Sequence, residues 1–406
     1  MSGPLAGIRV IECGGYLSAP SACYMLGDLG AEILKIEDRI KGDPVRGMES
    51  TFGRGMIMPD GTNILFETAN RNKKSLTLDL KKARGHEMLC RLVAASDVFC
   101  TNYSLPAIDN LDIGYETLKK YNSKLVYGLA TSYGSLGPDS NKRAFDAVAQ
   151  ARSGIMTTLG EPDSPPLQIA GALFDQVTGT ILASGIMAAL IARDKQGIGQ
   201  KVEVSLLGSG VHMQAYNVNV TLLRGRSMPR SSRKTLRNPL ANHYECADGK
   251  WLLLCEPQSD RFWHPFCLAL GIQQLEHDPK FADAKARRNN AMELTTILEI
   301  TFKTKARAEW LTALENQSQG MAFSPINDLT ELNSDPQILL NNYITEVDHP
   351  TLGKIKMTGF PFKFSQTPAA VARCAPGFGQ HTEEVLIDIL GLTWEDIGKL
   401  KDEEVI

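Results

Sequence analysis

The chain has 406 residues, of which 43% are hydrophobic and 22% charged, and its formal net charge is -3. That length suits two domains or one large domain with an insertion, and the composition is ordinary for a globular protein. With no long run of like charge, nothing indicates a nucleic-acid partner or an anionic membrane. The sequence does not open on a basic stretch followed by an apolar one, so we expect neither a signal peptide nor a membrane span.

Cysteine and histidine usage indicates neither disulfides nor a metal. The eight cysteines are scattered without a CxxC pair, and most lie among apolar residues. That usage is typical of buried, reduced thiols, so we expect a cytoplasmic protein. The seven histidines show neither HxH nor HExxH spacing, and we therefore expect no metal site.

The N-terminal residues predict a βαβ unit. Gly7–Cys13 is a short β-rich run that Gly14-Gly15 interrupts, a helix is expected over Pro20–Leu29, and Glu32–Glu37 is the next strand. A unit of this length implies parallel strands and a right-handed crossover. The glycines do not form GxGxxG, so a nicotinamide dehydrogenase has little support.

Strands and helices continue to alternate after a long loop over 42–61 that is rich in Gly, Met and Pro. The expected elements are strands at Ser75–Leu80, Asp97–Tyr103 and Leu125–Tyr133 and helices at Lys81–Ser96, Tyr115–Tyr121 and Arg143–Leu159. This alternation predicts a doubly wound α/β domain with a parallel sheet. Because such sheets bind ligands beyond the carboxyl ends of their strands, we expect Gly14–Ser18, Asn102-Tyr103 and Tyr133–Gly137 to lie at the ligand edge.

Asp175 stands just before a charge-free run of small and apolar residues, Val177–Ala192. A helix that is apolar nearly all round belongs in a core, and the run is shorter than the about 20 residues that span a bilayer. An acid in its first turn would face the positive end of the helix dipole and stay ionised. By itself, the stretch leaves open whether Asp175 is a helix cap or a functional carboxylate.

The pattern changes after a strand at Gln200–Leu206 and a helix at Leu207–Leu223. Arg224–Arg237 is a basic linker, and Asn242–Glu256 contains Asp-Gly between two apolar runs, which predicts a hairpin. The remaining expected elements are helices at Asp260–Leu270, Ala286–Phe302, Ala306–Asn316, Glu383–Leu390 and Thr393–Lys401 and strands at Gly353–Thr358 and Phe360–Ser365.

Short segments through nearly the whole chain match one family in the same order. The segments are Pro4–Val10, Leu29–Glu32 with Lys35–Glu37, Gly42–Pro44 with Arg46-Gly47, Asn72–Ser75 with Leu78-Asp79, Asn102-Tyr103, Phe145–Ala151, Asp175 with Thr178-Gly179, Gly197 with Gly199–Val202, and Gly379–Leu386. On these segments the chain resembles the class III CoA-transferases, the formyl-CoA transferase and CaiB–BaiF family. The middle of the chain matches least, mainly at Ala247–Trp251.

The resemblance implies an architecture and a set of partners. The large domain is expected to be a six-stranded doubly wound sheet completed by C-terminal residues, over 1–224 and 331–406. A smaller α+β domain, 225–330, is inserted in it. Two chains are expected to interlock, the partner being a second copy or a homologous subunit. The other partners are an acyl-CoA donor and a carboxylic acid acceptor, with no nucleic acid and no membrane.

The resemblance also assigns roles to residues. Asp175 is implied to be the nucleophile that forms an anhydride with the acyl group and then a thioester with CoA. Coenzyme A is a substrate, and no cofactor is bound permanently. The implied CoA contacts are Leu17, Ser18, Leu78, Lys81, Asn102, Tyr103, Ser104 and Arg143. From the residues alone, Arg143 can also be a solvated residue at a helix start, and Asp146 either orients its neighbours or makes a structural hydrogen bond.

Some positions depart from the relatives. Asp38 and Asn110 stand where some relatives carry basic residues, although Arg39 is adjacent, so we expect phosphate binding to differ in detail. Relatives that act on formyl and oxalyl groups have a glycine-rich loop in the small domain, and its absence here favours a larger, apolar or aromatic acid. Six residues either line an apolar acceptor pocket or belong to the core: Met56, Ile57, Met58, Phe145, Tyr216 and Trp251.

Two other functions suit the same fold. An α-methylacyl-CoA racemase needs two acid/base groups around an α-carbon. Such racemases carry a His immediately before the Asp that matches Asp146, and Phe145 stands there in this chain. A non-catalytic CoA-binding protein would lack the acid before Thr178-Gly179, whereas Asp175 is present.

Overall fold

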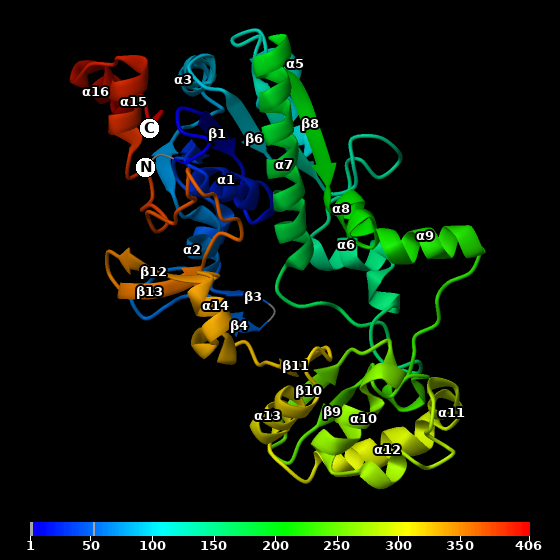
Figure 1. Ribbon diagram of the computed structural model, residues 1–406. Helices are drawn as coiled ribbons and strands as arrows, with labels where there is room; N and C mark the ends of the chain where they lie inside the picture. The colour runs from blue at the N-terminus through cyan, green and yellow to red at the C-terminus, as the bar shows by residue number, and fades with distance from the viewer. Residues whose placement is uncertain (1–2, 52) are drawn as a thin grey trace. The chain divides into compact units, whose positions relative to one another are not determined.

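The computed structural model describes residues 3–51 and 53–406, and it divides into two compact units (Figure 1). The larger unit comprises the chain up to Met156, Gln168–Arg226 and Leu339–Ile406, and the smaller unit comprises Thr157–Leu167 and Ser227–Ile338. The smaller unit is therefore wider than the 225–330 expected from the sequence.

The additional segment, Thr157–Leu167, joins the smaller unit through the basic linker. Arg230 donates hydrogen bonds from Nη1 to the carbonyl oxygens of Leu159 and Ser164, at 2.9 and 2.8 Å. Side-chain contacts of this kind between distant segments leave no periodic signal in the sequence.

The larger unit is built on a six-stranded parallel sheet, in the order β5-β2-β1-β6-β7-β8. The strands are β1 (Arg9–Cys13), β2 (Glu32–Glu37), β5 (Lys73–Thr77), β6 (Val98–Thr101), β7 (Val126–Thr131) and β8 (Gln200–Ser205). Helices cover both faces of the sheet, and only β6 and β7 are free of charged residues, whereas β8 alternates polar and apolar residues. The doubly wound α/β fold expected from the sequence is confirmed.

Helices cover the two faces of this sheet in different groups (Figure 1). On one face α1 (Ser18–Asp28) and α7 (Leu173–Gln196) pack on each other and share a core with Val10, Val98 and Val126. On the other face lie α3 (Ala83–Ala94), α15 (Thr382–Leu390) and α16 (Trp394–Asp402).

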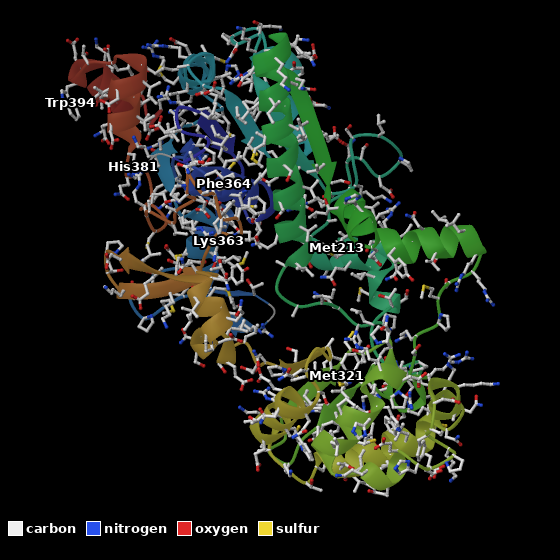
Figure 2. The ribbon with its side chains drawn as sticks, in the orientation of Figure 1. Met213, Met321, Lys363, Phe364, His381 and Trp394 are labelled. Atoms are coloured by element: carbon white, nitrogen blue, oxygen red, sulfur yellow. The ribbon has the colours of Figure 1, made fainter. Side chains whose placement is uncertain are left out.

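The C-terminal segment returns to the edge strand β5. The amide of His381 donates to the carbonyl oxygen of Ser75 at 2.9 Å, and the amide of Thr77 donates to Thr382 Oγ1 at 3.0 Å. Figure 2 labels His381 beside this edge and Trp394 at the start of α16. The C-terminal residues thus complete the large unit with helices, while all six strands of the sheet come from residues 9–205.

Helix α7 has 24 residues, more than the charge-free run suggested, because it continues through the polar residues after Ala192. Among the described residues it is the one helix whose length and composition would suffice to cross a membrane. It packs against α1, β7 and β8, as a core helix does.

The remaining elements of the large unit are short. They are α2 (Ile64–Asn70), α4 (Leu105–Asn110), α5 (Tyr115–Leu118), α6 (Asp146–Ser153), α8 (Leu206–Met213), α9 (Ala215–Arg224), the hairpin β3 (Ser50–Thr51) with β4 (Arg54–Gly55), and the hairpin β12 (Ile344–His349) with β13 (Gly353–Thr358). The strand expected at Phe360–Ser365 is wrong: β13 pairs with β12 instead, and Pro361 cannot donate to a strand ladder. The helix expected at Arg143–Leu159 is shortened to α6, which Gly154 ends at a φ of 85°.

In the smaller unit the Asp-Gly hairpin is confirmed as β9 (His243–Glu245) and β10 (Trp251–Leu254), and β11 (Phe323–Ile326) adds a third antiparallel strand. The helices are α10 (Ser259–Leu270), α11 (Ala284–Asn289), α12 (Ala291–Phe302) and α13 (Arg307–Gln317), with α14 (Pro336–Leu340) at the passage to the large unit. All eight cysteines are free thiols, and seven of them are buried.

Candidate active site

The β1–α1 loop, residues Gly14–Leu17, lies at the point where the strand order of the sheet reverses. From β1 the chain runs to β2 and β5 on one side, and β6 then pairs with β1 on the other side. Ligands of doubly wound sheets bind in the crevice at this switch point. The segments after β1 and β6 are two of the three that the sequence analysis placed at the ligand edge; the third, Tyr133–Gly137, follows β7.

Asn102 holds this loop from the side. Its Nδ2 donates to the carbonyl oxygen of Gly15 at 2.8 Å and to Ser18 Oγ at 3.0 Å, while its Oδ1 accepts from the amide of Gly15 at 3.0 Å. Leu17 and Ser18 are buried, with 6% and 7% of their surface exposed. The structure therefore brings Leu17, Ser18 and Asn102 together, and the polar groups of Asn102 shape the loop.

The start of α7 reaches the same loop because Gly179 has no side chain. A Cβ at Gly179 would lie 2.9 Å from the carbonyl oxygen of Ser18 and 2.6 Å from the Cβ of Ser21. Near the same end, Tyr24 Oη donates to Gln176 Oε1 at 3.2 Å. Asp175, one turn before Gly179, thus begins α7 beside the β1–α1 loop.

The N-terminus of α7 is capped by a residue from another helix. Ala172 occupies the cap position in the left-handed conformation, and its side chain makes no capping bond. Instead, Asp146 at the start of α6 accepts from the amides of Phe174 and Asp175, at 2.5 and 3.3 Å. Gln150 donates to the other oxygen of Asp146. The interpretation of Asp175 as the helix cap is therefore wrong, and Asp146 was missed in that role because it is distant in the sequence.

The carboxyl group of Asp175 is not the fully ionised acid that the sequence suggested. Burial, and secondarily the negative charge of Asp146, raise the pKa of Asp175 to about 7. Desolvation and a like charge both disfavour the carboxylate, and here they outweigh the positive end of the helix.

Three of the other expected CoA contacts line a recess beyond β2 and β5. Leu78, Lys81 and Tyr103 line this recess of about 70 Å³, together with Asp38. Ser104 is exposed at the start of α4, and Arg143 is exposed on the loop that leads into α6, outside the recess. The structure thus divides the expected contacts between the β1–α1 loop, the recess and the exposed Arg143.

A larger cavity of about 650 Å³ opens between α7 and α8, beyond β7 and β8. Its walls include Leu136, Ile181 and Val204, and Ser209 lines it with a buried hydroxyl. Helix α8 packs against the start of α7, since a Cβ at Gly210 would meet the ring of Phe174. An apolar cavity therefore lies on the side of α7 that faces α8.

Three of the six residues offered as acceptor-pocket or core residues are too exposed for a core. Ile57, Phe145 and Tyr216 expose 42%, 54% and 75% of their surface. The ring of Phe145 packs edge-on against Tyr16, with the centroids 5.7 Å apart. Tyr16 is a loop residue that the sequence analysis did not single out; its φ of 58° is the only signal, and it is visible only in the structure.

One group of possible metal ligands occurs among the described residues. Ligand atoms of Glu67, His349 and Cys374 lie within 4.8 Å of one another. The amides of Thr351 and Leu352 point at Nδ1 of His349, at 3.3 and 3.2 Å, so the neutral ring carries its proton on Nε2, which faces Glu67 at 3.6 Å. A metal needs that nitrogen without its proton. The arrangement is therefore a histidine–carboxylate pair.

Substitution of Gly179 by alanine is expected to destabilise the chain by about 1–3 kcal/mol, because the new Cβ would push α7 away from α1. Urea unfolding measures this change in the free energy of unfolding. Gly398→Ala is the control, since nothing lies within 4 Å of a Cβ at that position. A Gly179→Ala variant as stable as the wild type would contradict the close approach of the two helices.

The chain is similar to known proteins in both sequence and fold. The sequence profile described as "CoA-transferase family III" matches residues 5–382. Succinyl-CoA:glutarate CoA-transferase of Mus musculus is 32% identical over 405 residues, which cover 99% of this chain and 90% of the mouse protein. Succinyl-CoA–D-citramalate CoA-transferase of Chloroflexus aurantiacus is 30% identical over 403 residues, covering 99% and 98%. A crystal structure of a CAIB/BAIF family protein from Brucella suis matches with a TM-score of 0.86 and 29% identity, over 96% of this chain and 100% of that chain.

Proposed function

The chain belongs to CoA-transferase family III and is a CoA-transferase, and we propose that it moves CoA from an acyl-CoA donor to a carboxylic acid through covalent intermediates on Asp175. One observation carries this proposal: a half-buried carboxyl group with a raised pKa stands at the start of α7, beside the loop at the switch point of the sheet. The contacts of Asp146 with the first amides of α7 fix the helix end from which Asp175 projects.

The first half of the reaction loads CoA onto Asp175. The carboxylate attacks the thioester carbonyl of the donor, the C–S bond breaks, and the products are a mixed anhydride and the CoA thiolate. The thiolate then attacks the aspartyl carbonyl of the anhydride, and the donor acid leaves as its carboxylate. Asp175 is now an aspartyl-CoA thioester.

The second half repeats these steps with the acceptor. The acceptor carboxylate attacks the aspartyl thioester and releases the thiolate, which gives a second anhydride. Attack of the thiolate on the acceptor carbonyl forms the new acyl-CoA and restores the Asp175 carboxylate. No proton or electron is gained or lost overall, so the reaction needs no separate base and no permanently bound cofactor.

Racemisation of an acyl-CoA is the rival within the same fold, and the surroundings of Asp146 argue against it. That chemistry needs two groups that exchange a proton with one carbon. Asp146 lies next to Asp175, but its oxygens accept hydrogen bonds from Phe174, Asp175 and Gln150. Phe145, which stands before it, carries no acid/base group. The other alternative from the sequence, a CoA-binding protein without catalysis, is set aside because the chain is a CoA-transferase.

We also propose that the acceptor has an apolar body. The cavity between α7 and α8 supports this, since most of its walls are apolar and α8 packs against the start of α7. Glu203 and His212 on the walls would suit a ligand that also carries a polar group.

The enzyme is proposed to act as a dimer, formed with a second copy or with a homologous subunit. Helix α9 supports this proposal because none of its residues is buried. Tyr216, Leu222 and Leu223 expose 75%, 73% and 88% of their surface along it. Apolar side chains gathered on one exposed helix indicate a protein–protein contact.

Transfer is separated from racemisation by an isotope experiment. A chiral 2-methylacyl-CoA in deuterated water, without an acceptor acid, is expected to retain its α-hydrogen, because no second base faces that carbon. With succinyl-CoA or acetyl-CoA as donor, a panel of carboxylic acids is expected to yield new acyl-CoA, most rapidly from apolar or aromatic acids. Rapid α-exchange without an acceptor, detected by mass spectrometry, would refute the transferase mechanism.

A further inference from the structure

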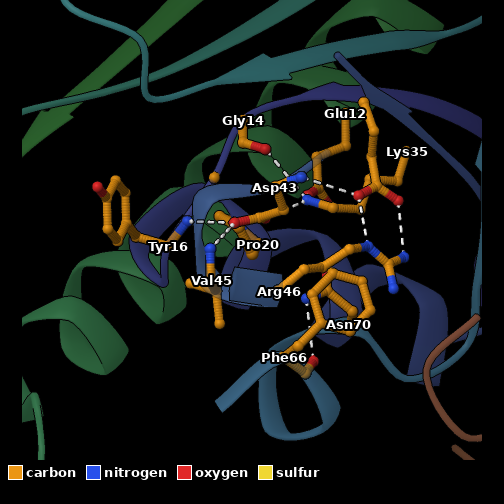
Figure 3. Close-up of polar contacts among 12 residues, drawn as sticks. Glu12, Gly14, Tyr16, Pro20, Lys35, Asp43, Val45, Arg46, Phe66 and Asn70 are labelled. Carbon is orange, nitrogen blue, oxygen red and sulfur yellow. Dashed lines mark hydrogen bonds and ion pairs between the residues drawn. The ribbon is translucent and has the colours of Figure 1, made fainter. Parts of the chain in front are cut away.

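Four charged side chains form a buried network directly beneath the β1–α1 loop (Figure 3). Lys35 on β2 lies 2.7 Å from Glu12 on β1 and 2.8 Å from Asp43, and Lys73 on β5 lies 2.6 Å from the other oxygen of Glu12. All four side chains are fully buried. Two lysines and two carboxyl groups are thus held together away from the surface.

The opposite charges around Glu12 and Lys35 favour the ionised forms of these two side chains, whereas burial lowers the pKa of Lys73. Burial opposes the charged form of Glu12, but Lys35 and Lys73 outweigh it and lower the pKa of Glu12 below its ordinary value. Burial likewise opposes the ammonium form of Lys35, but Glu12 and Asp43 outweigh it and raise the pKa of Lys35. Removing one member alone would leave an uncompensated buried charge. The ion pairs therefore fix the positions of these side chains, and of the backbone groups that they bind.

The network touches the loop through Asp43 and Lys35. Asp43 Oδ1 accepts from the amides of Tyr16 and Val45, at 3.3 and 3.0 Å. Lys35 Nζ donates to the carbonyl oxygen of Gly14 at 3.1 Å. Figure 3 shows Asp43 between Tyr16 and Lys35, so one carboxylate joins the buried charges to the loop backbone.

The loop needs such support because its backbone is strained. Tyr16 has a φ of 58°, in the left-handed region that residues other than glycine rarely adopt. Residues in this region persist where the surrounding structure holds them, and they gather at ligand sites. A Cβ at Gly15 would lie 3.1 Å from the Cδ of Pro44, so the segment that carries Asp43 also packs directly under the loop.

We propose that Asp43 is a positioning residue, which holds the β1–α1 loop in the shape that binds CoA by accepting the amide hydrogen of Tyr16. The proposal rests on the CoA-transferase function proposed above. The side chain of Asp43 is fully buried beneath the loop, so it acts on the backbone and not on the ligand itself. A loop that is already ordered in the free enzyme loses less entropy on binding, which increases affinity.

The test uses two double variants that keep the network neutral. Lys35→Met combined with Asp43→Asn removes one charge of each sign and keeps an oxygen that can accept from Tyr16 and Val45. Lys35→Met combined with Asp43→Ala removes the same charges and the acceptor. We expect the alanine form to bind CoA roughly tenfold more weakly than the asparagine form, by isothermal titration calorimetry, with faster hydrogen exchange at the Tyr16 amide. Equal CoA affinity in the two forms would overturn the proposal.

The matched control is the buried ion pair at the opposite end of α1. Arg71 Nη2 lies 2.6 Å from Asp28 Oδ2, and both side chains are buried. Asp28→Asn combined with Arg71→Met is expected to lower stability while leaving CoA affinity and exchange at Tyr16 unchanged. A loss of CoA affinity as large as that of the Lys35–Asp43 alanine form would assign the effect to stability alone.

The wild-type enzyme gives a test that needs no variant. In the free enzyme the amide of Tyr16 is expected to exchange far more slowly than an unprotected amide, because Asp43 holds it. Unprotected exchange there would overturn the positioning role, whatever the ligand is. Absence of CoA binding to the wild type, with the Tyr16 amide protected, would instead refute the proposed function.

Discussion

Replacement of Asp175 by alanine is expected to abolish CoA transfer, by at least about 10⁴-fold in kcat, because in the proposed mechanism its carboxylate forms both covalent intermediates. Binding of CoA is expected to persist, since the β1–α1 loop and the recess at Leu78 and Tyr103 do not depend on that carboxyl group. Turnover assays measure the first effect and calorimetry the second. Retained turnover would remove Asp175 from the mechanism.

The intermediate itself can be trapped. Wild-type enzyme mixed with acyl-CoA and hydroxylamine is expected to carry a hydroxamate on Asp175, because hydroxylamine attacks activated acyl groups such as an anhydride or a thioester. Peptide mass spectrometry locates the adduct. Asp194→Ala is a suitable control, because Asp194 lies towards the other end of α7 and exposes 68% of its side chain. An adduct on another residue would move the covalent chemistry away from α7.

Asp146→Asn is expected to move the pH dependence of the reaction to lower pH. In the wild type, kcat/KM is expected to rise through the pKa of Asp175, about 7, because in the proposed mechanism only the carboxylate attacks the thioester. Asparagine removes the like charge and retains an oxygen for the amide of Phe174, so the pKa of Asp175 should fall while burial still holds it above the ordinary value. Rate profiles between pH 5 and 9 measure the shift, and Asp194→Asn serves as the control. An unchanged profile would show that Asp146 does not influence the ionisation of Asp175.

The raised pKa of Asp175 also predicts how the free energy of unfolding depends on pH. The model-compound pKa of an aspartic acid is 3.8, so between pH 4 and 7 the folded chain retains a proton on Asp175 that the unfolded chain releases. The free energy of unfolding therefore falls as the pH rises through this window, by up to about 4 kcal/mol from this group. In Asp175→Asn that loss disappears, so the stability advantage of the variant over the wild type should grow from pH 4 to 7 and then level off. Urea unfolding at several pH values measures it.

The sequence by itself determined the order of the elements and the class of the fold. Alternating β-rich runs and amphipathic stretches fixed the parallel sheet, and Asp-Gly between two apolar runs fixed the hairpin of β9 and β10. These signals are local, because turn chemistry and hydrophobic periodicity act over a few neighbouring residues. The same reasoning placed Asp175 in the first turn of the apolar helix, where the structure has it.

Only the tertiary structure decided the environment of Asp175 and the shape of the loop beside it. Asp146 caps α7 from another helix, and Asn102 and Asp43 hold the β1–α1 loop from distant parts of the chain. The pKa of a group depends on how much water and charge surround it. A hydrogen bond from a distant side chain to the loop depends on where folding places that side chain. Neither quantity is periodic along the chain. For that reason the sequence identified Asp175 as an acid at a helix start, while folding raised its pKa and gave the role of cap to Asp146.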